Sequence, residues 1–314
     1  MSSSGPLLSG VVVHWHDEQA LGELLAAWPD DPRFELIVVD NGSDRPLPPG
    51  PYELLSPGTN LGFAGGANLG FETARSPAVL LLNPDARPEP GALEALLAGL
   101  EAQPDAAGLA PRLVGADGRP QLTWQLRRLP WLSDLLAQAL FFAPRLGPRR
   151  EPPAGAEVEQ PAAAALVLRR AAWAQAGGFD AGFFPAWFED VDLARRLRRL
   201  GLVLRYWPAA EFRHRLGASV PRLGYGAFLW VHDRNLARYV AIHHGRAAAV
   251  LVKAALALGS LVRLAALPLR RPRRAASRRE AAAGLLAVAA GALSGWRRPG
   301  FYAEQFAPPR ESRP

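Results

Sequence analysis

Val79-Leu80-Leu81-Leu82-Asn83-Pro84-Asp85 begins with four apolar residues and reaches an acid directly after a proline. An apolar run of this kind is typical of a strand buried on both faces of a parallel sheet. Pro84 cannot donate to a ladder, so the strand is predicted to stop at Asn83. Asp85 is then expected beyond the carboxyl end of a central strand, where open α/β sheets bind ligands and a carboxylate suits a hard divalent cation. A turn aspartate is the alternative.

Segments before and after this stretch alternate between buried strands and helices. Strands are predicted at 7–13, 34–39, 52–55, 106–112, 162–168 and 202–207, and helices at 18–27, 66–74, 90–100, 170–176 and 189–201. This alternation predicts an α/β domain with a mostly parallel central sheet and helices on both faces. The domain is expected to cover residues 1–220, with a helical, basic region at 221–314.

Polar residues follow two further strands of the predicted sheet. Asp40 ends the second strand, and a glycine-rich run from Asn60 to Gly70 follows the third. Glycines let a backbone approach a ligand closely, and the amino end of the helix that continues from Gly66 favours negative charge. Taken singly, each feature has an ordinary structural explanation as a turn or tight connection. Their occurrence in this order at the same edge of the sheet favours a ligand-binding site.

The segment 189–201 combines a core stripe with a cluster of acids. Val191, Ala194 and Leu197 recur at helical spacing, which predicts a buried face. Glu189, Asp190 and Asp192 occupy the first turn and arginines follow, so charge complements the helix dipole. First-turn acids are common in helices, and the pattern alone does not assign them a role.

The composition is that of a folded protein without disulfides or thiolate metal sites. With 49% apolar and 21% charged residues in 314, the chain is expected to fold, and the absence of cysteine excludes disulfides and thiolate metal sites. Residues 1–10 contain no lysine or arginine and lead into a short apolar run, so we expect neither a signal peptide nor an anchor there, and a cytoplasmic start.

The net charge of +7 is concentrated near the carboxyl end. Seven arginines and no acid lie between Arg263 and Arg279, beside two apolar helical segments at 247–267 and 281–293. This arrangement favours an anionic membrane surface as partner, with no nucleic acid. An interfacial helix pair is the preferred interpretation, and a transmembrane hairpin and a packed helical cap are the alternatives.

Five ordered stretches resemble the inverting nucleotide-sugar glycosyltransferases of family 2 with the GT-A fold, especially the rhamnosyltransferase-like branch. The resemblance covers residues 8–220. The stretches are Val38-Val39-Asp40-Asn41-Gly42-Ser43, Asn60-Leu61-Gly62-Phe63-Ala64-Gly65-Gly66-Ala67-Asn68, Leu80-Leu81-Leu82-Asn83-Pro84-Asp85, Gly177-Gly178-Phe179-Asp180 through Phe188-Glu189-Asp190-Val191-Asp192-Leu193, and His214-Arg215-Leu216-Gly217-Ala218-Ser219.

The resemblance implies a role for each matched position. Residues expected to bind the donor are Asp40, Asn60, Gly62, Gly65, Asn68 and Asn83. Asp85 is implied as a ligand of Mg²⁺ or Mn²⁺, with His214 completing the metal or diphosphate site. Asp190 is implied as the general base that accepts the acceptor hydroxyl's proton, and Glu189 as an orienting or acceptor-binding acid beside it.

The resemblance therefore implies an enzyme that transfers a sugar, rhamnose from its dTDP donor as the leading guess, to a lipid-linked or polysaccharide acceptor. It is expected on the cytoplasmic face of the membrane. The chain departs from the family at His14-Trp15-His16, where relatives usually have Asn or Thr and then Asn. A nicotinamide-dependent oxidoreductase would need G-x-G-x-x-G at that point, which is absent. A non-catalytic sugar-nucleotide sensor or membrane adaptor on the same fold stays open.

Overall fold

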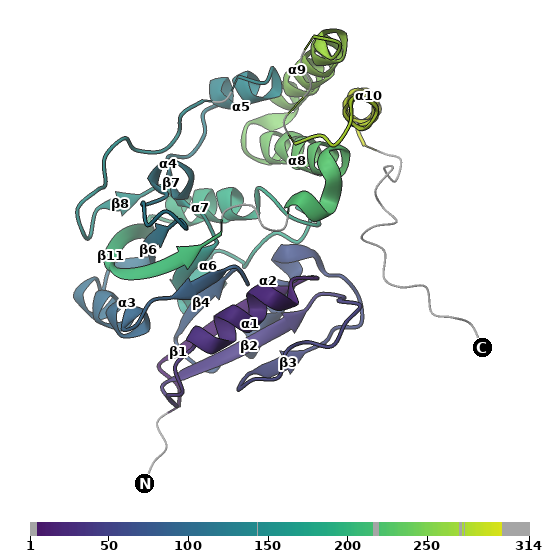
Figure 1. Ribbon diagram of the computed structural model, residues 1–314. Coiled ribbons are helices and arrows are strands. Elements are labelled where there is room, and N and C mark those ends of the chain that lie inside the picture. Colours follow the sequence, from purple (N-terminus) through teal and green to yellow (C-terminus); the bar gives the residue numbers. More distant parts are fainter. Residues whose placement is uncertain (1–4, 143, 216–219, 270–271, 273, 297–314) are drawn as a thin grey trace. The chain divides into compact units, whose positions relative to one another are not determined.

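The computed structural model describes residues 5–142, 144–215, 220–269, 272 and 274–296, which group into two compact units (Figure 1). Of the described residues, the first unit contains those within 5–129, 146–182 and 189–215, and the second contains those within 130–145, 183–188 and 220–296. Leu216, Gly217, Ala218 and Ser219 of the fifth family stretch lie outside the described residues, as do Arg270, Arg271 and Arg273.

The first unit is built on a nine-stranded sheet in the order β3-β2-β1-β4-β10-β6-β11-β5, with β8 paired to β11. Pairs β1–β2, β1–β4, β2–β3 and β6–β11 are parallel, and β10 is antiparallel to both its neighbours. The strands are β1 Leu8–His14, β2 Phe34–Asp40, β3 Glu53–Leu55, β4 Ala78–Leu82, β5 Ala86–Pro88, β6 Ala106–Val114, β8 Glu157–Val158, β10 Ala165–Arg169 and β11 Val203–His214, with β7 Leu126–Arg127 and β9 Gln160–Pro161 forming a separate pair.

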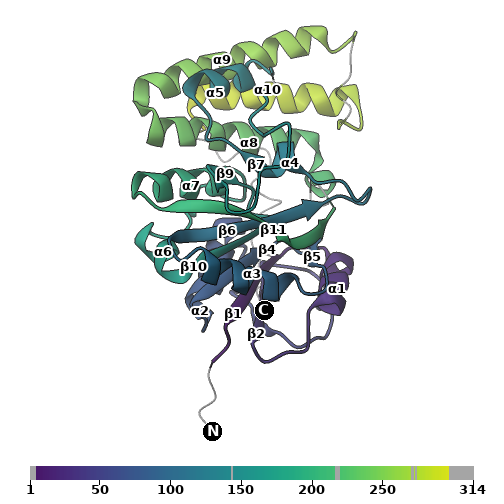
Figure 2. The same ribbon diagram turned by 90° about the vertical axis from the view of Figure 1, so that its left-hand side faces the viewer.

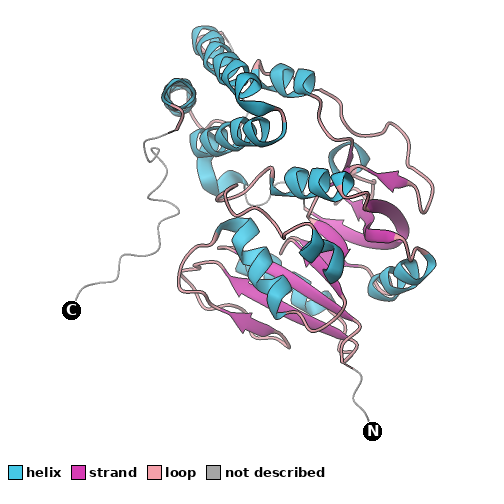
Figure 3. Ribbon diagram, turned by 180° about the vertical axis from the view of Figure 1, so that it is seen from behind, coloured by secondary structure: helices cyan, strands magenta, loops and turns pink. Residues whose placement is uncertain are grey.

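Helices cover both faces of this sheet, as alternation along β1 shows (Figure 3). Leu8 and Val12 join a core with leucines of α1 and α3, whereas Val11 and Val13 face glycines of α2. Such alternation is what a strand buried on both sides requires. The helices of this unit are α1 Glu18–Ala27, α2 Gly62–Thr73, α3 Ala92–Ala102, α4 Leu122–Gln125, α6 Arg170–Gln175 and α7 Glu189–Arg199. The predicted α/β class is confirmed.

Two of the differences from the sequence-based expectation bear on the site. The helix predicted from Gly66 begins at Gly62, so the glycine-rich run is mostly helical. A Cβ on Gly70 would lie 2.3 Å from a methyl of Val11, so this glycine serves close packing of α2 on β1. The last strand was expected to end before Pro208, but β11 continues to His214 through a register shift between Trp207 and Glu211.

The second unit is helical, with α5 Leu132–Ala139, α8 Val220–His243, α9 Gly245–Ala266 and α10 Arg278–Ser294. It also holds the aromatic loop 183–188, because the Asn235 amide on α8 donates to the carbonyl oxygens of Phe183, Ala186 and Trp187 at 3.0, 2.8 and 3.3 Å. Helices α9 and α10 lie alongside each other (Figure 2).

Candidate active site

The carboxyl ends of β1, β2 and β4 meet at one edge of the sheet. His14 is in register with Asp40, and Val12 with Leu82, the last residue of β4. Because these three neighbouring strands are parallel, the loops that begin at Asp40 and Asn83 leave the sheet on the same side. The structure therefore brings the predicted acids Asp40 and Asp85 to this edge.

Asp85 and His214 form a buried pair. Short strand β5 begins at Ala86 and pairs antiparallel with the end of β11, in register with His214. This pairing places an Asp85 carboxylate oxygen, Oδ1, 3.6 Å from Nε2 of His214, and the two side chains are 6% and 2% exposed. The extension of β11 beyond Pro208 is what carries the histidine to this position.

Gln121 determines which nitrogen of His214 carries the proton. Its amide Nε2 donates to the His214 carbonyl oxygen at 2.9 Å, so its Oε1 is the atom that lies 2.8 Å from His214 Nδ1. Because an amide oxygen only accepts, Nδ1 must be the protonated ring nitrogen of the neutral imidazole. Nε2 is then left with a free lone pair, directed at the carboxylate of Asp85.

Burial keeps the His214 ring neutral. It lowers the pKa of His214 to about 4, because desolvation disfavours the imidazolium. The indole of Trp124 stacks on the ring, with centroids 5.0 Å apart and an interplanar angle of 22°. The imidazole is therefore fixed in orientation by the stack, and in tautomer by Gln121.

This pair fits a shared divalent cation. A carboxylate oxygen and an imidazole nitrogen that each bind a metal at about 2.1 Å lie roughly 3–3.6 Å apart when the angle at the metal is between about 90 and 120°. The observed separation of Oδ1 and Nε2 falls at the upper end of that range. An outer hydrogen bond to the ligating histidine, as Gln121 supplies, is typical of metal sites.

We expect Gln121→Leu to weaken Mn²⁺ binding by about ten- to a hundredfold, because Nε2 can then take up the proton that Gln121 holds on Nδ1. Gln121→Glu keeps an acceptor oxygen and should retain most of the affinity. Calorimetric titration of Mn²⁺ measures both, with Gln19→Leu, an exposed glutamine of α1, as the control. Equal affinities for Gln121→Leu and the unaltered chain would contradict this role.

Asp190, in the first turn of α7, contacts the guanidinium of Arg127 and the side-chain amide of Gln160. Its Oδ2 is 3.6 Å from an Arg127 guanidinium nitrogen and accepts a hydrogen bond from the Gln160 amide at 3.2 Å, while Oδ1 accepts from the Val191 backbone at 2.8 Å. The side chain is 15% exposed, so it is partly accessible. The paired strands β7 and β9 supply Arg127 and Gln160. Neither partner was identified from the sequence.

Glu189 differs from its neighbour, because it is almost fully buried. Burial, and then the charge of Asp190, raise the pKa of Glu189 well above its ordinary value. Within the described residues its Oε2 has no hydrogen-bond partner. A carboxyl group in this setting favours the protonated form, so Asp190 is the better candidate for a base.

We expect Glu189→Gln to lessen the loss of stability between pH 5 and pH 8. An unfolded glutamate releases its proton near its ordinary pKa, whereas the buried Glu189 keeps it to higher pH, so the contribution of Glu189 to stability is greatest at low pH. It then falls by up to about 1.4 kcal/mol per pH unit until the raised pKa is reached. Urea denaturation at several pH values measures this, with Glu101→Gln on the exposed side of α3 as the control. Parallel pH profiles for Glu189→Gln and the unaltered chain would show that Glu189 ionises normally.

One short segment links the buried pair to Asp190. It runs from Gln121, bonded to His214, through α4 to Arg127, which pairs with Asp190. Six residue steps span at most about 20 Å, and the helical turn in the middle shortens that reach. Gln125 fixes the segment to β6 by accepting from the Leu113 backbone at 3.1 Å and donating to the Pro111 carbonyl. A short segment anchored on β6 therefore connects the Asp85–His214 pair to Asp190.

The predicted donor-binding residues are engaged in local structure. Asp40 Oδ1 accepts from the Ser43 backbone at 2.9 Å, and Asn60 Oδ1 accepts from the Gly62 backbone at 2.8 Å. Gly62 has a φ of 71°, which favours glycine, and Gly65 lies on the next turn of α2. The amide of Asn68 bonds the nitrogen and oxygen of Phe179, both at 2.8 Å. The backbone N–H of Asn83 donates to Ala164 at 2.9 Å.

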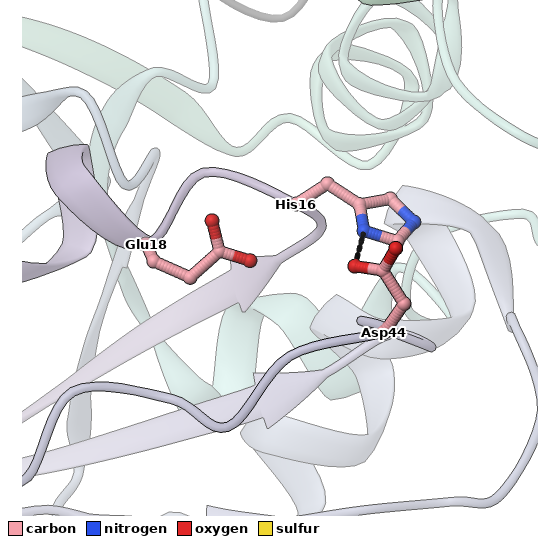
Figure 4. A group of neighbouring side chains, drawn as sticks. All are labelled: His16, Glu18 and Asp44. Carbon is pink, nitrogen blue, oxygen red and sulfur yellow. Dashed lines mark hydrogen bonds and ion pairs between the residues drawn. The ribbon is translucent and has the colours of Figure 1, made fainter.

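The two histidines after β1 have different settings. His14 is fully buried: its Nε2 accepts from the Asp17 backbone at 3.2 Å, so Nδ1 donates to the Ser43 hydroxyl at 3.0 Å. His16 pairs with Asp44 at 3.0 Å, and Glu18 joins them with all three ligand atoms within 4.8 Å (Figure 4). Asp44 is largely exposed and already paired, so we assign these side chains no metal. His14 ties β1 to the loop that follows Asp40.

Comparison with known proteins agrees with this arrangement. The sequence profile of glycosyl transferase family 2 matches residues 11–145. The chain carries a glycosyltransferase family 2 domain. The family match contains Asp40, Asn83 and Asp85, whereas Asp190 and His214 lie beyond it.

Proteins similar to this chain include an N-acetylglucosaminyl-diphospho-decaprenol L-rhamnosyltransferase of Mycobacterium tuberculosis. It is 28% identical over 234 residues, which cover 67% of this chain and 71% of the relative. An uncharacterised protein of Mycobacterium bovis is 29% identical over 228 residues, which cover 69% and 77%. A crystal structure of GalNAc-T7 with UDP, GalNAc and Mn²⁺ superposes with a TM-score of 0.54 at 14% identity. That match covers 77% of this chain and 48% of the solved one, and it supports the GT-A fold.

Proposed function

We propose that this glycosyltransferase moves a sugar from a nucleotide-sugar donor to an acceptor hydroxyl in a single displacement that inverts the anomeric centre. The observation that carries the proposal is the buried Asp85–His214 pair, with its tautomer set by Gln121 and with residues 121–127 connecting it to Asp190. Paired carboxylate and imidazole ligands suit a diphosphate-bound cation, and a separate, partly accessible carboxylate suits proton abstraction.

Asp85 and His214 would hold Mg²⁺ or Mn²⁺ against the donor diphosphate. When bound, the cation neutralises the charge that builds on the leaving nucleoside diphosphate, a contribution of several kcal/mol to the transition state. Asp40, Asn60, Gly62, Gly65 and Asn83 would border the donor at the sheet edge. Asn68 would contribute to the donor site indirectly, by holding the Phe179 backbone in place, because its side-chain nitrogen and oxygen both bond that backbone.

Asp190 would accept the proton of the acceptor hydroxyl as the oxygen attacks the anomeric carbon. The oxygen gains a bond to carbon, the bond between carbon and diphosphate breaks, and the diphosphate leaves with the electron pair. Arg127 and Gln160 would orient the carboxylate through Oδ2. Glu189, which is buried, would support the geometry of the site and would not accept the acceptor's proton.

The donor is proposed to be dTDP-rhamnose and the acceptor a lipid-linked or polysaccharide hydroxyl. The support is the similarity to a rhamnosyltransferase whose name specifies a diphospho-decaprenol acceptor. We therefore also propose that the protein works at a membrane, on its cytoplasmic face.

A thermal-shift panel of nucleotide-sugars, with and without Mn²⁺, tests the donor and the metal together. The true donor should raise the melting temperature only when Mn²⁺ is present, because it binds the folded form alone. Slow metal-dependent hydrolysis of the same compound would distinguish an enzyme from a non-catalytic sensor or adaptor. Stabilisation without any hydrolysis or transfer would favour the adaptor, and no stabilisation by any nucleotide-sugar would overturn the proposal.

A further inference from the structure

The outer side of α9 is apolar along its whole length. Exposed residues recur every three or four positions, which places them on one side of the helix. Two of the larger side chains, Val250 and Leu258, are 67% and 57% exposed. We call this set the α9 stripe: Ala247, Val250, Leu251, Ala254, Leu258, Leu261, Val262 and Ala265.

The opposite side of α9 is buried within the second unit. Val252, Leu256 and Ser260 are fully buried, and α9 packs against α5, α8 and α10. The approach to α5 is close, because a Cβ on Gly259 would lie 2.6 Å from the Ala139 carbonyl oxygen. The helix therefore has a protein-facing side, and the α9 stripe is left without a partner among the described residues.

A second apolar stripe lies on α10, which runs beside α9 (Figure 2). Ala283, Leu286, Ala290 and Leu293 are exposed at helical spacing. Leu269, in the connection between the two helices, is also exposed. Exposed apolar surface of this extent marks an interaction site rather than ordinary surface.

The segment that carries these stripes is rich in basic residues and nearly free of acidic ones. Residues 241–296 contain nine lysines and arginines and a single acid, Glu280. Glu280 is already engaged, because its oxygens accept from the backbone of Tyr225 at 2.9 Å and of Ala276 at 2.7 Å. The exposed arginines that the structure describes lie at the helix ends, at Arg246, Arg274, Arg278 and Arg279. Their charge faces solvent without a matching carboxylate on the same segment.

We propose that the α9 stripe docks on the surface of an anionic bilayer, with the helix lying in the interface plane. Apolar side chains would enter the acyl boundary while the arginines at the helix ends contact lipid phosphates. A second copy of the chain would bring like charges together, which charge complementarity opposes.

A membrane span is the other use that the helix allows. Gly245–Ala266 is long and apolar enough to cross a bilayer, with a mean hydropathy of 1.8 over an 18-residue window. However, it carries Lys253 and Arg263, and the Arg263 guanidinium lies 3.4 Å from the centre of the Phe141 ring within the same unit. One side of α9 is committed to protein contacts, so only its outer side is available to lipid.

The test is sedimentation of the full chain with vesicles of phosphatidylcholine alone or with about a third phosphatidylglycerol. We expect the chain to bind the anionic vesicles and to bind the neutral ones at least about tenfold more weakly. High salt should release it from the anionic vesicles. The double variant Leu258→Glu, Leu261→Glu should lose at least about tenfold in binding. Leu54→Glu makes the same change at a leucine of β3 that is 49% exposed, and should bind normally. Lipid-free hydrolysis of the donor should be unchanged in both, so failure of docking and failure of the proposed function can be told apart.

Several outcomes would overturn surface docking. Retention in the membrane through alkaline carbonate extraction would indicate insertion of α9 as a span. A concentration-dependent dimer that the double variant abolishes, with no vesicle binding, would indicate that a second copy covers the stripe. Unchanged binding by the folded double variant, checked by circular dichroism, would place the lipid contact elsewhere.

Discussion

Asp190→Asn is expected to lower the rate of sugar transfer by about a hundred- to ten-thousand-fold while leaving donor binding nearly intact. The amide keeps the size of the carboxylate and can still contact Gln160, but it cannot accept the proton of the acceptor hydroxyl. Transfer kinetics at saturating donor, together with the thermal shift caused by the donor, measure the two effects separately.

Asp105→Asn is the matched control for this experiment. Asp105 also pairs with an arginine, Arg205, at 2.6 Å, but it is exposed at the far end of β6 from the site. This control should keep normal turnover. An Asp190→Asn enzyme with normal turnover would remove Asp190 from the role of base, and an equal loss in both variants would indicate a general effect of removing an ion pair.

Asp85→Asn is expected to abolish Mn²⁺ binding at micromolar concentrations and to lower the transfer rate by about a hundredfold or more, because removal of a metal's charge compensation costs several kcal/mol. His214→Ala should act in the same direction, since it removes the second atom of the pair. Calorimetric titration of Mn²⁺ and transfer rates at rising metal concentration measure the effect, and excess metal should restore part of the activity.

Asp44→Asn provides the control for the metal experiment. Asp44 belongs to the group with His16 and Glu18, the other place where ligand atoms gather among the described residues. We expect this variant to bind Mn²⁺ with unchanged affinity. If Asp44→Asn loses the metal and Asp85→Asn keeps it, the cation binds beside His16 and the assignment of Asp85 and His214 is wrong.

Much of the α/β core follows from local patterns. The apolar run at 79–82 specifies a two-sided strand, and β4 is Ala78–Leu82. The helix predicted at 189–201 is α7, because its acids, arginines and apolar stripe agree with one another. Patterns of this kind involve residues only a few positions apart, so they can be recognised in a single sequence.

The environment of the predicted site residues could not be derived in this way. Gln121 and His214 are 93 positions apart, and Arg127 and Asp190 are 63 apart. Nothing near Gln121 in the sequence marks it as a partner of a histidine. Likewise, adjacent acids Glu189 and Asp190 look alike in sequence and differ only through their depth in the fold.

The sequence by itself determined most strands and helices of the α/β core, the edge of the sheet at which Asp40 and Asp85 lie, and the resemblance to glycosyltransferase family 2. Tertiary structure alone decided the tautomer of His214, the partners of Asp190, the burial of Glu189, and which side of α9 stays exposed. The physical reason is range: propensity and periodicity act over a few neighbouring residues. Protonation, desolvation and packing depend on groups that folding brings together from distant parts of the chain.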